Sequence, residues 1–190
     1  MSKKYVLFLR GVNVNGVAIK MKELKEALNG MGYSDVQTIL ATGNVVLTLD
    51  DSEPFGELEA AEIAQGLGKE FQYDCHLFLR NEQELGKLLA AASSVEVPDD
   101  YHHYCLVCDS GEVLSELNDM FQSVSKAPGE QFIVLDKDAF WIVPKGSTLA
   151  SDFGSKVLGK KAFKSRLTSR NMNTINKVYA VCSSPLDHTL

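Results

Sequence analysis

The sequence has few cysteines, few prolines, a single tryptophan and no long run of apolar residues. Its four cysteines are scattered, without the dense pairing pattern of a small disulfide-stabilised secreted domain. Apolar runs such as residues 5–9 are far shorter than a membrane span and too short for a signal-peptide core. These absences predict a cytoplasmic protein in which Cys75, Cys105, Cys108 and Cys182 act as small core residues.

The composition is that of an ordinary globular protein, with 45% hydrophobic and 23% charged residues, and 190 residues allow one large domain or two small ones. The net charge of −6 argues against a general polyanion binder. The charges are unevenly placed, because residues 50–70 are strongly acidic whereas residues 153–186 contain no acid and seven cations. We expect these two runs to complement each other across two halves of the chain, although the basic run also suits a solvated helix face.

The first eighty residues predict the element order β-α-β-β-α-β. A strand over residues 4–9 precedes a helix from about Lys20, whose apolar stripe ends near Gly30. Strands at 36–40 and 45–49 flank a turn in which Gly43 and Asn44 suit positive φ. A helix after Pro54 and a strand at 75–79 complete an arrangement that is ferredoxin-like.

The same order recurs in the second half, which indicates a duplication seen in topology rather than in sequence identity. A joining helix over residues 82–92 leads to strands at 101–108, 131–135, 140–143 and 164–167, with helices after 111 and around 151–158. A last helix follows, with Thr168, Ser169 and Asn171 as candidate caps. The predicted fold is therefore α+β, a tandem duplication of ferredoxin-like units with antiparallel sheets. The expected boundaries are 1–81 for the first unit, 82–98 for the linking helix and 99–190 for the second unit with the C-terminal helix.

The loop over residues 10–16 carries one Arg, two Asn and two Gly directly after the first strand. In an antiparallel β-α-β-β-α-β sheet this loop and the central hairpin lie at the same end, so we expect a polar concavity there. The candidate ligand-binding residues are Arg10, Asn13, Asn15, Lys20, Thr42 and Asn44. The alternative, which the residue types favour for Asn13 and Asn15, is that the Asn side chains only hold tight turns.

The loop has only half of a nucleotide-binding motif. Gly11 and Gly16 have the G-x-x-x-x-G spacing, but Val17-Ala18 stands where Lys-Ser/Thr is required. The sequence therefore supports a simple anion cradle and not a nucleotide hydrolase.

A second candidate site begins at Arg170, which we expect at the start of the last helix. A helix N-terminus is already positive, so a cation there indicates an anion opposite, either a ligand or a carboxylate of the other half. If Arg170 reaches the cleft of Arg10, then Asn171 and Thr174 join the same ligand site.

Three motifs stand in an order that resembles one bacterial family, the domain of unknown function numbered 1697: RGVNV at 10–14, TGNVV at 42–46 and RNMNT at 170–174. The likeness covers nearly the whole chain and implies tandem ferredoxin-like domains, without implying an activity. Asn15 and Met172 depart from the family pattern, in which Gly and Trp are expected.

No catalytic residue, cofactor or metal site is predicted. Asp152-Phe153-Gly154 lacks the other motifs of a kinase. Cys105 and Cys108 fall three apart in a strand and so face opposite sides, as do the adjacent residues His102 and His103.

The leading hypothesis is a binding protein for a small anionic, phosphate-bearing ligand in a polar cleft. One alternative is an enzyme that acts on a nucleotide or phosphate ester in the same cleft. The other is an RNA or single-stranded DNA binder that uses the basic C-terminal region, with Tyr104, Phe140 and Trp141 as a stacking platform.

Overall fold

The structure, a computed structural model, describes residues 2–13, 18–50, 55–158 and 160–185. The chain divides into two compact units, the first made of residues 1–87 and 176–190 and the second of residues 88–175. The chain leaves the first unit within helix α3 (Glu82–Ala92) and returns to it within helix α7 (Met172–Cys182). No helix in the described part combines the length and the apolar character that a membrane span requires.

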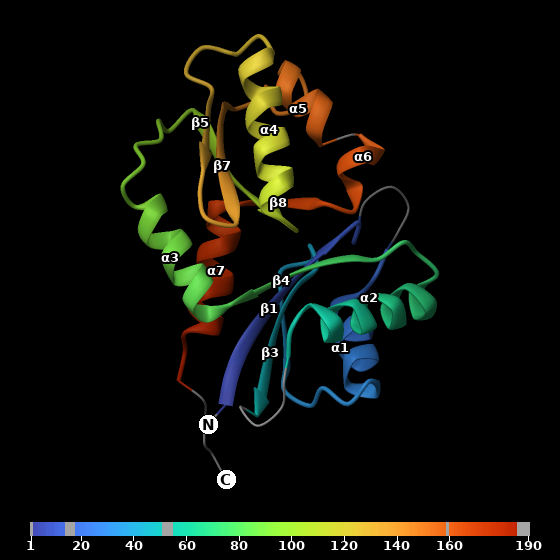
Figure 1. Ribbon diagram of the computed structural model, residues 1–190. Helices are drawn as coiled ribbons and strands as arrows, with labels where there is room; N and C mark the ends of the chain where they lie inside the picture. Colours follow the sequence, from blue (N-terminus) through green and yellow to red (C-terminus); the bar gives the residue numbers. More distant parts are fainter. Residues whose placement is uncertain (1, 14–17, 51–54, 159, 186–190) are drawn as a thin grey trace. The chain divides into compact units, whose positions relative to one another are not determined.

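The first unit has the predicted element order. Its sheet has four antiparallel strands in the order β2-β3-β1-β4, and helices α1 and α2 lie beside this sheet (Figure 1). The elements are β1 (Ser2–Arg10), α1 (Met21–Gly30), β2 (Val36–Ile39), β3 (Asn44–Asp50), α2 (Glu57–Phe71) and β4 (His76–Asn81).

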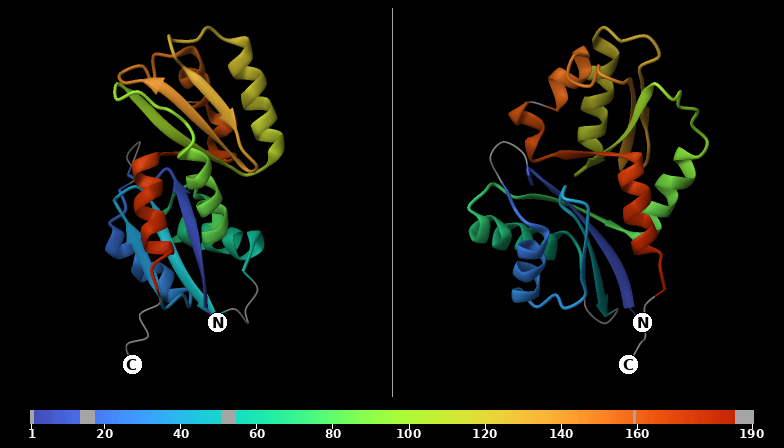
Figure 2. Two further views of the ribbon diagram at one scale, coloured as in Figure 1. Left: turned by 90° about the vertical axis from the view of Figure 1, so that its left-hand side faces the viewer. Right: turned by 180° about the vertical axis from the view of Figure 1, so that it is seen from behind.

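Alternation along β1 decides which side chains form the core of the first unit. Leu7 and Leu9 point to one face of the sheet, where Leu24 and Leu28 of α1 pack with Ile63 of α2. Figure 2 shows α1 and α2 lying on one face of this sheet. The stripes predicted for these helices are thus the buried faces, which is the usual reason that short helices are stable in a protein.

The second unit repeats the sheet, in the order β6-β7-β5-β8 and again antiparallel. Its elements are β5 (Tyr101–Cys108), α4 (Gly111–Ser123), β6 (Gln131–Val134), β7 (Asp138–Pro144), α5 (Asp152–Val157), α6 (Lys161–Lys164) and β8 (Leu167–Asn171).

The strand predicted at 164–167 is wrong in position. The lysine-rich segment around the buried Phe163 forms the single-turn helix α6, and the strand begins only at Leu167. One apolar side chain between lysines satisfies a helical turn, whereas burial alternates between neighbouring residues only from Thr168 on.

The two units share a repeated junction between the last strand and the helix that follows. Arg80-Asn81 ends β4 and Arg170-Asn171 ends β8, and each pair is followed at once by a helix of 11 residues. Each arginine is buried and donates from Nη1 to the preceding carbonyl, over 2.6 Å for Arg80 and 2.8 Å for Arg170. Each Asn Oδ1 accepts a backbone N–H of the new helix over 2.9 Å, so both residues are N-caps. The duplication is therefore visible in residues as well as in topology.

Lys4 connects the first strand to the end of helix α7 within the first unit. Its Nζ donates to the carbonyl oxygens of Val181 over 3.0 Å and Ser184 over 2.7 Å, and the residue is only 8% exposed. A cation at a helix C-terminus interacts favourably with the exposed carbonyl groups there. The final helix is thus fastened to the strand with which the first unit begins.

Candidate functional site

The loop after β1 meets the β2–β3 hairpin, as predicted from the topology. The N–H of Leu9 donates to the carbonyl of Gly43 over 2.7 Å, and Asn13 Nδ2 donates to the carbonyl of Ala41 over 2.5 Å. Gly43 has φ +72°, and a Cβ there would lie 3.0 Å from the Cβ of Leu9. Glycine at this position therefore permits both the turn and the close approach of the two segments. We call this meeting point the Arg10 corner.

Asn44 holds the hairpin from inside rather than presenting itself to a ligand. It is the first residue of β3 and fully buried, and its Nδ2 donates to the carbonyl of Ile39 over 2.8 Å and to Oγ1 of Thr42 over 2.9 Å. The positive φ expected for Asn44 belongs instead to Leu40, at +58°. The amide of Asn44 can then satisfy the turn's carbonyl without leaving the strand.

Asn13 also has a structural role, in agreement with the interpretation favoured for it. Besides the bond to Ala41, its Oδ1 accepts the N–H of Ile19 over 2.9 Å, so both ends of the amide are used. Lys20 is exposed and forms an ion pair of 3.2 Å with Glu23. Asn15, the remaining candidate of this loop, lies outside the described residues.

Arg10 retains the character expected of a binding residue. It ends β1 half-buried, and this burial lowers the pKa of its guanidinium below the ordinary value, while the group stays protonated at neutral pH. After it the backbone turns through positive φ at Gly11 (+85°) and Asn13 (+57°). Within the described part of the chain, the N–H groups of residues 11–13 find no acceptor. The corner thus combines a partly desolvated cation with backbone donors.

Residues at the start of β4 border the same corner and were missed from the sequence. Arg10 pairs with His76 across the β1–β4 ladder, and Nε2 of His76 lies 3.0 Å from Oδ2 of Asp74. The Tyr73 ring lies 3.9 Å from where a Cβ of Gly11 would be. The predicted topology could have identified these residues, because β4 runs antiparallel to β1 and its first residues must lie opposite the last residues of β1.

The thiol in this segment lies in surroundings that disfavour the thiolate. Burial raises the pKa of Cys75 to about 11, although the hydrogen bond from the Tyr73 hydroxyl, 2.9 Å long, acts in the other direction. A thiol with such a pKa is protonated at neutral pH and is a poor nucleophile. Among the described residues, no group of three or more His, Cys, Asp or Glu side chains suits a metal ion.

Arg170 lies next to the start of the last helix, as expected, but it belongs to the preceding strand. Arg170 lies inside β8, buried, and its Nη1 donates to Thr168 Oγ1 and to the carbonyl of Ser169, each over 2.8 Å. The strand extends to Asn171, which itself caps α7, so Arg170 stands in the strand, one residue before the N-cap of the helix. Thr174 is half-buried in the first turns of α7. That Arg10 and Arg170 share one cleft stays a prediction.

The aromatic platform considered for RNA is not available in the second unit. Phe140 and Trp141 are both fully buried on opposite faces of the sheet. Trp141 stacks with Tyr104 at 5.6 Å and donates from Nε1 to Glu130 over 2.9 Å. In the basic run, Arg166 forms an ion pair with Glu116 of the same unit.

Comparison with known proteins places the chain beside proteins whose function is not known. A family model described as "Protein of unknown function (DUF1697)" matches residues 2–140. The solved structure of conserved bacterial protein SP0830 from Streptococcus pneumoniae is similar, with 18% identity, a TM-score of 0.75 and coverage of 97% of this chain and 100% of that one. At this identity the likeness shows a common fold.

A structure of an unknown protein from Galdieria sulphuraria also aligns, over 96% of this chain and 91% of that one, with 11% identity. Its TM-score of 0.26 is too low to support an argument. No curated protein matches the chain.

Proposed function

Because the chain belongs to the DUF1697 family, whose function is unknown, we propose one from its geometry: the first unit binds a small anion, such as a phosphate group, at the Arg10 corner. The proposal takes each unit as ferredoxin-like and the protein as cytoplasmic, in keeping with its four free cysteines.

The observation that carries the proposal is the set of donors around Arg10. A half-buried guanidinium interacts with an anion more strongly than an exposed one, since less water screens the charge. Successive backbone N–H groups in a turn with positive φ form the kind of concavity that receives phosphate oxygens. Asn13, Thr42 and Asn44, which were predicted to touch the ligand, instead hold the two walls of this corner in place.

Titration with inorganic phosphate, followed by amide NMR shifts, tests the proposal. We expect the largest shifts at residues 11–13 and about tenfold or greater weakening of binding in Arg10→Met, because a charge-assisted contact is lost. The matched control is Lys25→Met, which removes an exposed cation of α1 and should leave binding unchanged. Equal binding by Arg10→Met and the native protein would show that Arg10 has a structural role only.

A second candidate function, acid–base catalysis on a bound phosphate ester, is favoured by one observation. His76 neighbours Arg10 across the ladder and is oriented by Asp74, which is how a carboxylate fixes the imidazole of a general base. An ester hydrolysis assay with Asp74→Asn and His76→Gln decides this candidate. Turnover that survives both substitutions rejects it, whereas loss of turnover with retained phosphate binding supports it.

A further inference from the structure

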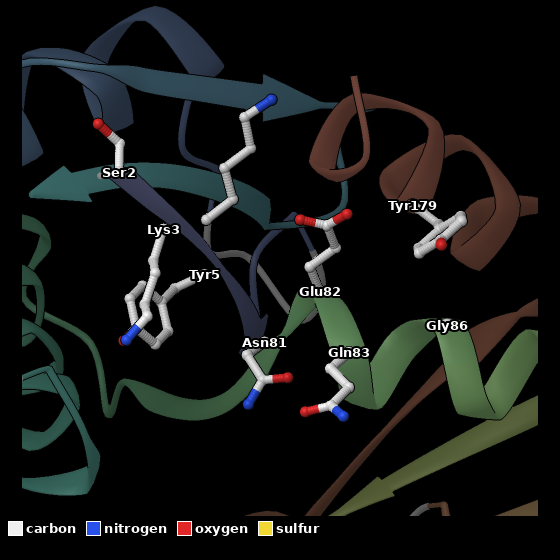
Figure 3. Close-up of a pocket in the computed structure, with 9 residues that line it drawn as sticks. Ser2, Lys3, Tyr5, Asn81, Glu82, Gln83, Gly86 and Tyr179 are labelled. Carbon is white, nitrogen blue, oxygen red and sulfur yellow. The ribbon is translucent and has the colours of Figure 1, made fainter. Parts of the chain in front are cut away.

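A groove of about 640 Å³ lies at the other end of β1 from the Arg10 corner. It is lined by the first residues of β1, by the junction of β4 with α3, and by Tyr179 of α7, all of them parts of the first unit (Figure 3). This volume is within the range of pockets that hold small molecules. The side chains that line the groove decide which kind of ligand it suits.

The ammonium group of Lys4 is committed to the protein. Although Lys4 lines the groove, its Nζ donates to the carbonyls of Val181 and Ser184, and the side chain is almost wholly buried. A buried ammonium so bonded is costly to withdraw from its acceptors. Lys4 thus lines the groove with the aliphatic part of its side chain, and its ammonium group is not available to an anionic ligand.

The carboxylate of Glu82 is in the opposite situation. Glu82 is exposed, and it forms neither a hydrogen bond nor an ion pair with any residue that the structure describes. The capping role at the start of α3 belongs to Glu84, whose Oε2 accepts the N–H of Asn81 over 2.9 Å. In Figure 3 Glu82 points to the side of α3 on which Tyr179 lies, while Asn81 and Gln83 point away from it.

Tyr179 of α7 lines the groove on the side of α3 to which Glu82 points (Figure 3). Its hydroxyl lies 3.3 Å from where a Cβ of Gly86 would be, so the glycine lets the phenol approach the backbone of α3 closely. Glycine inside a helix is unfavourable relative to alanine, and this contact gives a packing reason for it. The residues that line the groove therefore include a carboxylate without a bond to any described residue and a phenol, and both groups suit a cation.

The charge of Glu82 also acts on a buried thiol of α7. Cys182, a buried residue at the end of α7, has a pKa raised to about 11, first by burial and then by Glu82, and the opposing effect of Lys4 is the smaller. At Cys182 the effect of Glu82 therefore exceeds that of Lys4, although two lysines, Lys3 and Lys4, line the groove with Glu82.

We propose that the groove binds a small organic ligand through a protonated primary amine, with the Glu82 carboxylate as the counter-charge and Tyr179 as the wall that covers it. The competing explanation is that Glu82 only complements the dipole of α3, as acidic residues in a first helical turn do. That explanation predicts no saturable ligand binding.

The probe is 1,4-diaminobutane, tested by calorimetry at low salt and by amide NMR. We expect saturable binding with shifts at Ser2 and Gly86, and a loss of binding for the diacetylated compound, which has the same chain but no charge. Glu82→Gln should weaken binding about tenfold or more, because it removes the charge and keeps the shape. The matched control, Glu70→Gln, removes an exposed carboxylate of α2 and should have no effect.

Three outcomes overturn the proposal: no saturable binding up to about 10 mM amine, which corresponds to a negligible affinity; equal binding by Glu82→Gln and the native protein; or equal binding of the diacetylated compound. Circular dichroism of each variant checks that its total helix content matches that of the native protein. A result at this groove is independent of phosphate binding at the Arg10 corner, because the two experiments use different probes and different variants.

Discussion

Replacing Lys4 by Met should destabilise the protein far more than its position near the start of the chain suggests. The substitution keeps the length and apolar stem of the side chain but removes the ammonium that bonds the carbonyls of Val181 and Ser184. The last turn of α7 then loses its cation. Methionine suits the buried stem position, so the effect isolates the loss of charge.

The magnitude follows from the contacts. Two charge-assisted hydrogen bonds contribute about 1.5 kcal/mol each, and the favourable interaction with the helix end adds about 0.5 kcal/mol. Against this, burying the ammonium of Lys4, a residue only 8% exposed, costs free energy in the native protein. The variant avoids roughly 1–2 kcal/mol of that cost. The expected net loss in the free energy of unfolding is about 2 kcal/mol, or a fall in Tm of about 4–8 °C for a chain of this size.

The assay is urea unfolding of Lys4→Met beside Lys25→Met, which alters an exposed cation of α1. Native-state hydrogen exchange adds a local measurement, since the amides of α7 near Val181 should lose protection in Lys4→Met only. If the two variants differ by less than about 0.5 kcal/mol, which is the size of an ordinary surface effect, the bonds of Lys4 do not stabilise the helix.

Two further predictions concern the caps and the thiols. Asn81→Ala and Asn171→Ala should each lower the free energy of unfolding by about 1 kcal/mol, because the two residues cap equivalent helices. The control Asn29→Ala, on the exposed side of α1, should have little effect. Clearly unequal losses for Asn81→Ala and Asn171→Ala would contradict the equivalence of the two caps. The folded pKa values of Cys75 and Cys182 are raised from 9.0 to about 11, first by burial, so the free energy of unfolding should fall as pH rises from about 9 to about 11. Below pH 9 both thiols are protonated in the folded and the unfolded state, so their full contribution to stability is present. Cys75→Ala and Cys182→Ala should therefore weaken the fall in unfolding free energy with pH above 9, measured by denaturation at several pH values. An unchanged pH dependence in the variants would argue against the raised thiol pKa values.

Most of the fold could be predicted from the sequence because the signals are local and agree with one another. The alternation of β1 and the stripe of α1 place Leu7 and Leu24 in one core, and Glu82–Ala92 is a helix over the residues expected. The prediction failed around Phe163, where one apolar residue among lysines is compatible with either period. Arg170 falls in the strand rather than in the helix for the same reason, since a strand that starts late also ends late.

The candidate site could be predicted in location but not in composition. Topology brings the loop after β1 to the β2–β3 hairpin, which required no knowledge of side chains. Whether an Asn faces a ligand or a carbonyl depends on the direction of one amide, and Asn13 and Asn44 both turn toward backbone. His76 was overlooked because it is far from Arg10 in sequence, although the antiparallel pairing of β1 with β4 makes them neighbours.

The bonds of Lys4 also set an order for the completion of the two units during synthesis. Their acceptors come 177 and 180 positions after Lys4 along the chain. A chain made from its N-terminus has the whole of residues 88–175, the second unit, before it has these acceptors. On the ribosome, the unit that is begun first is therefore the unit that is finished last, and until then its opening strand carries a lysine whose acceptors have not yet been made.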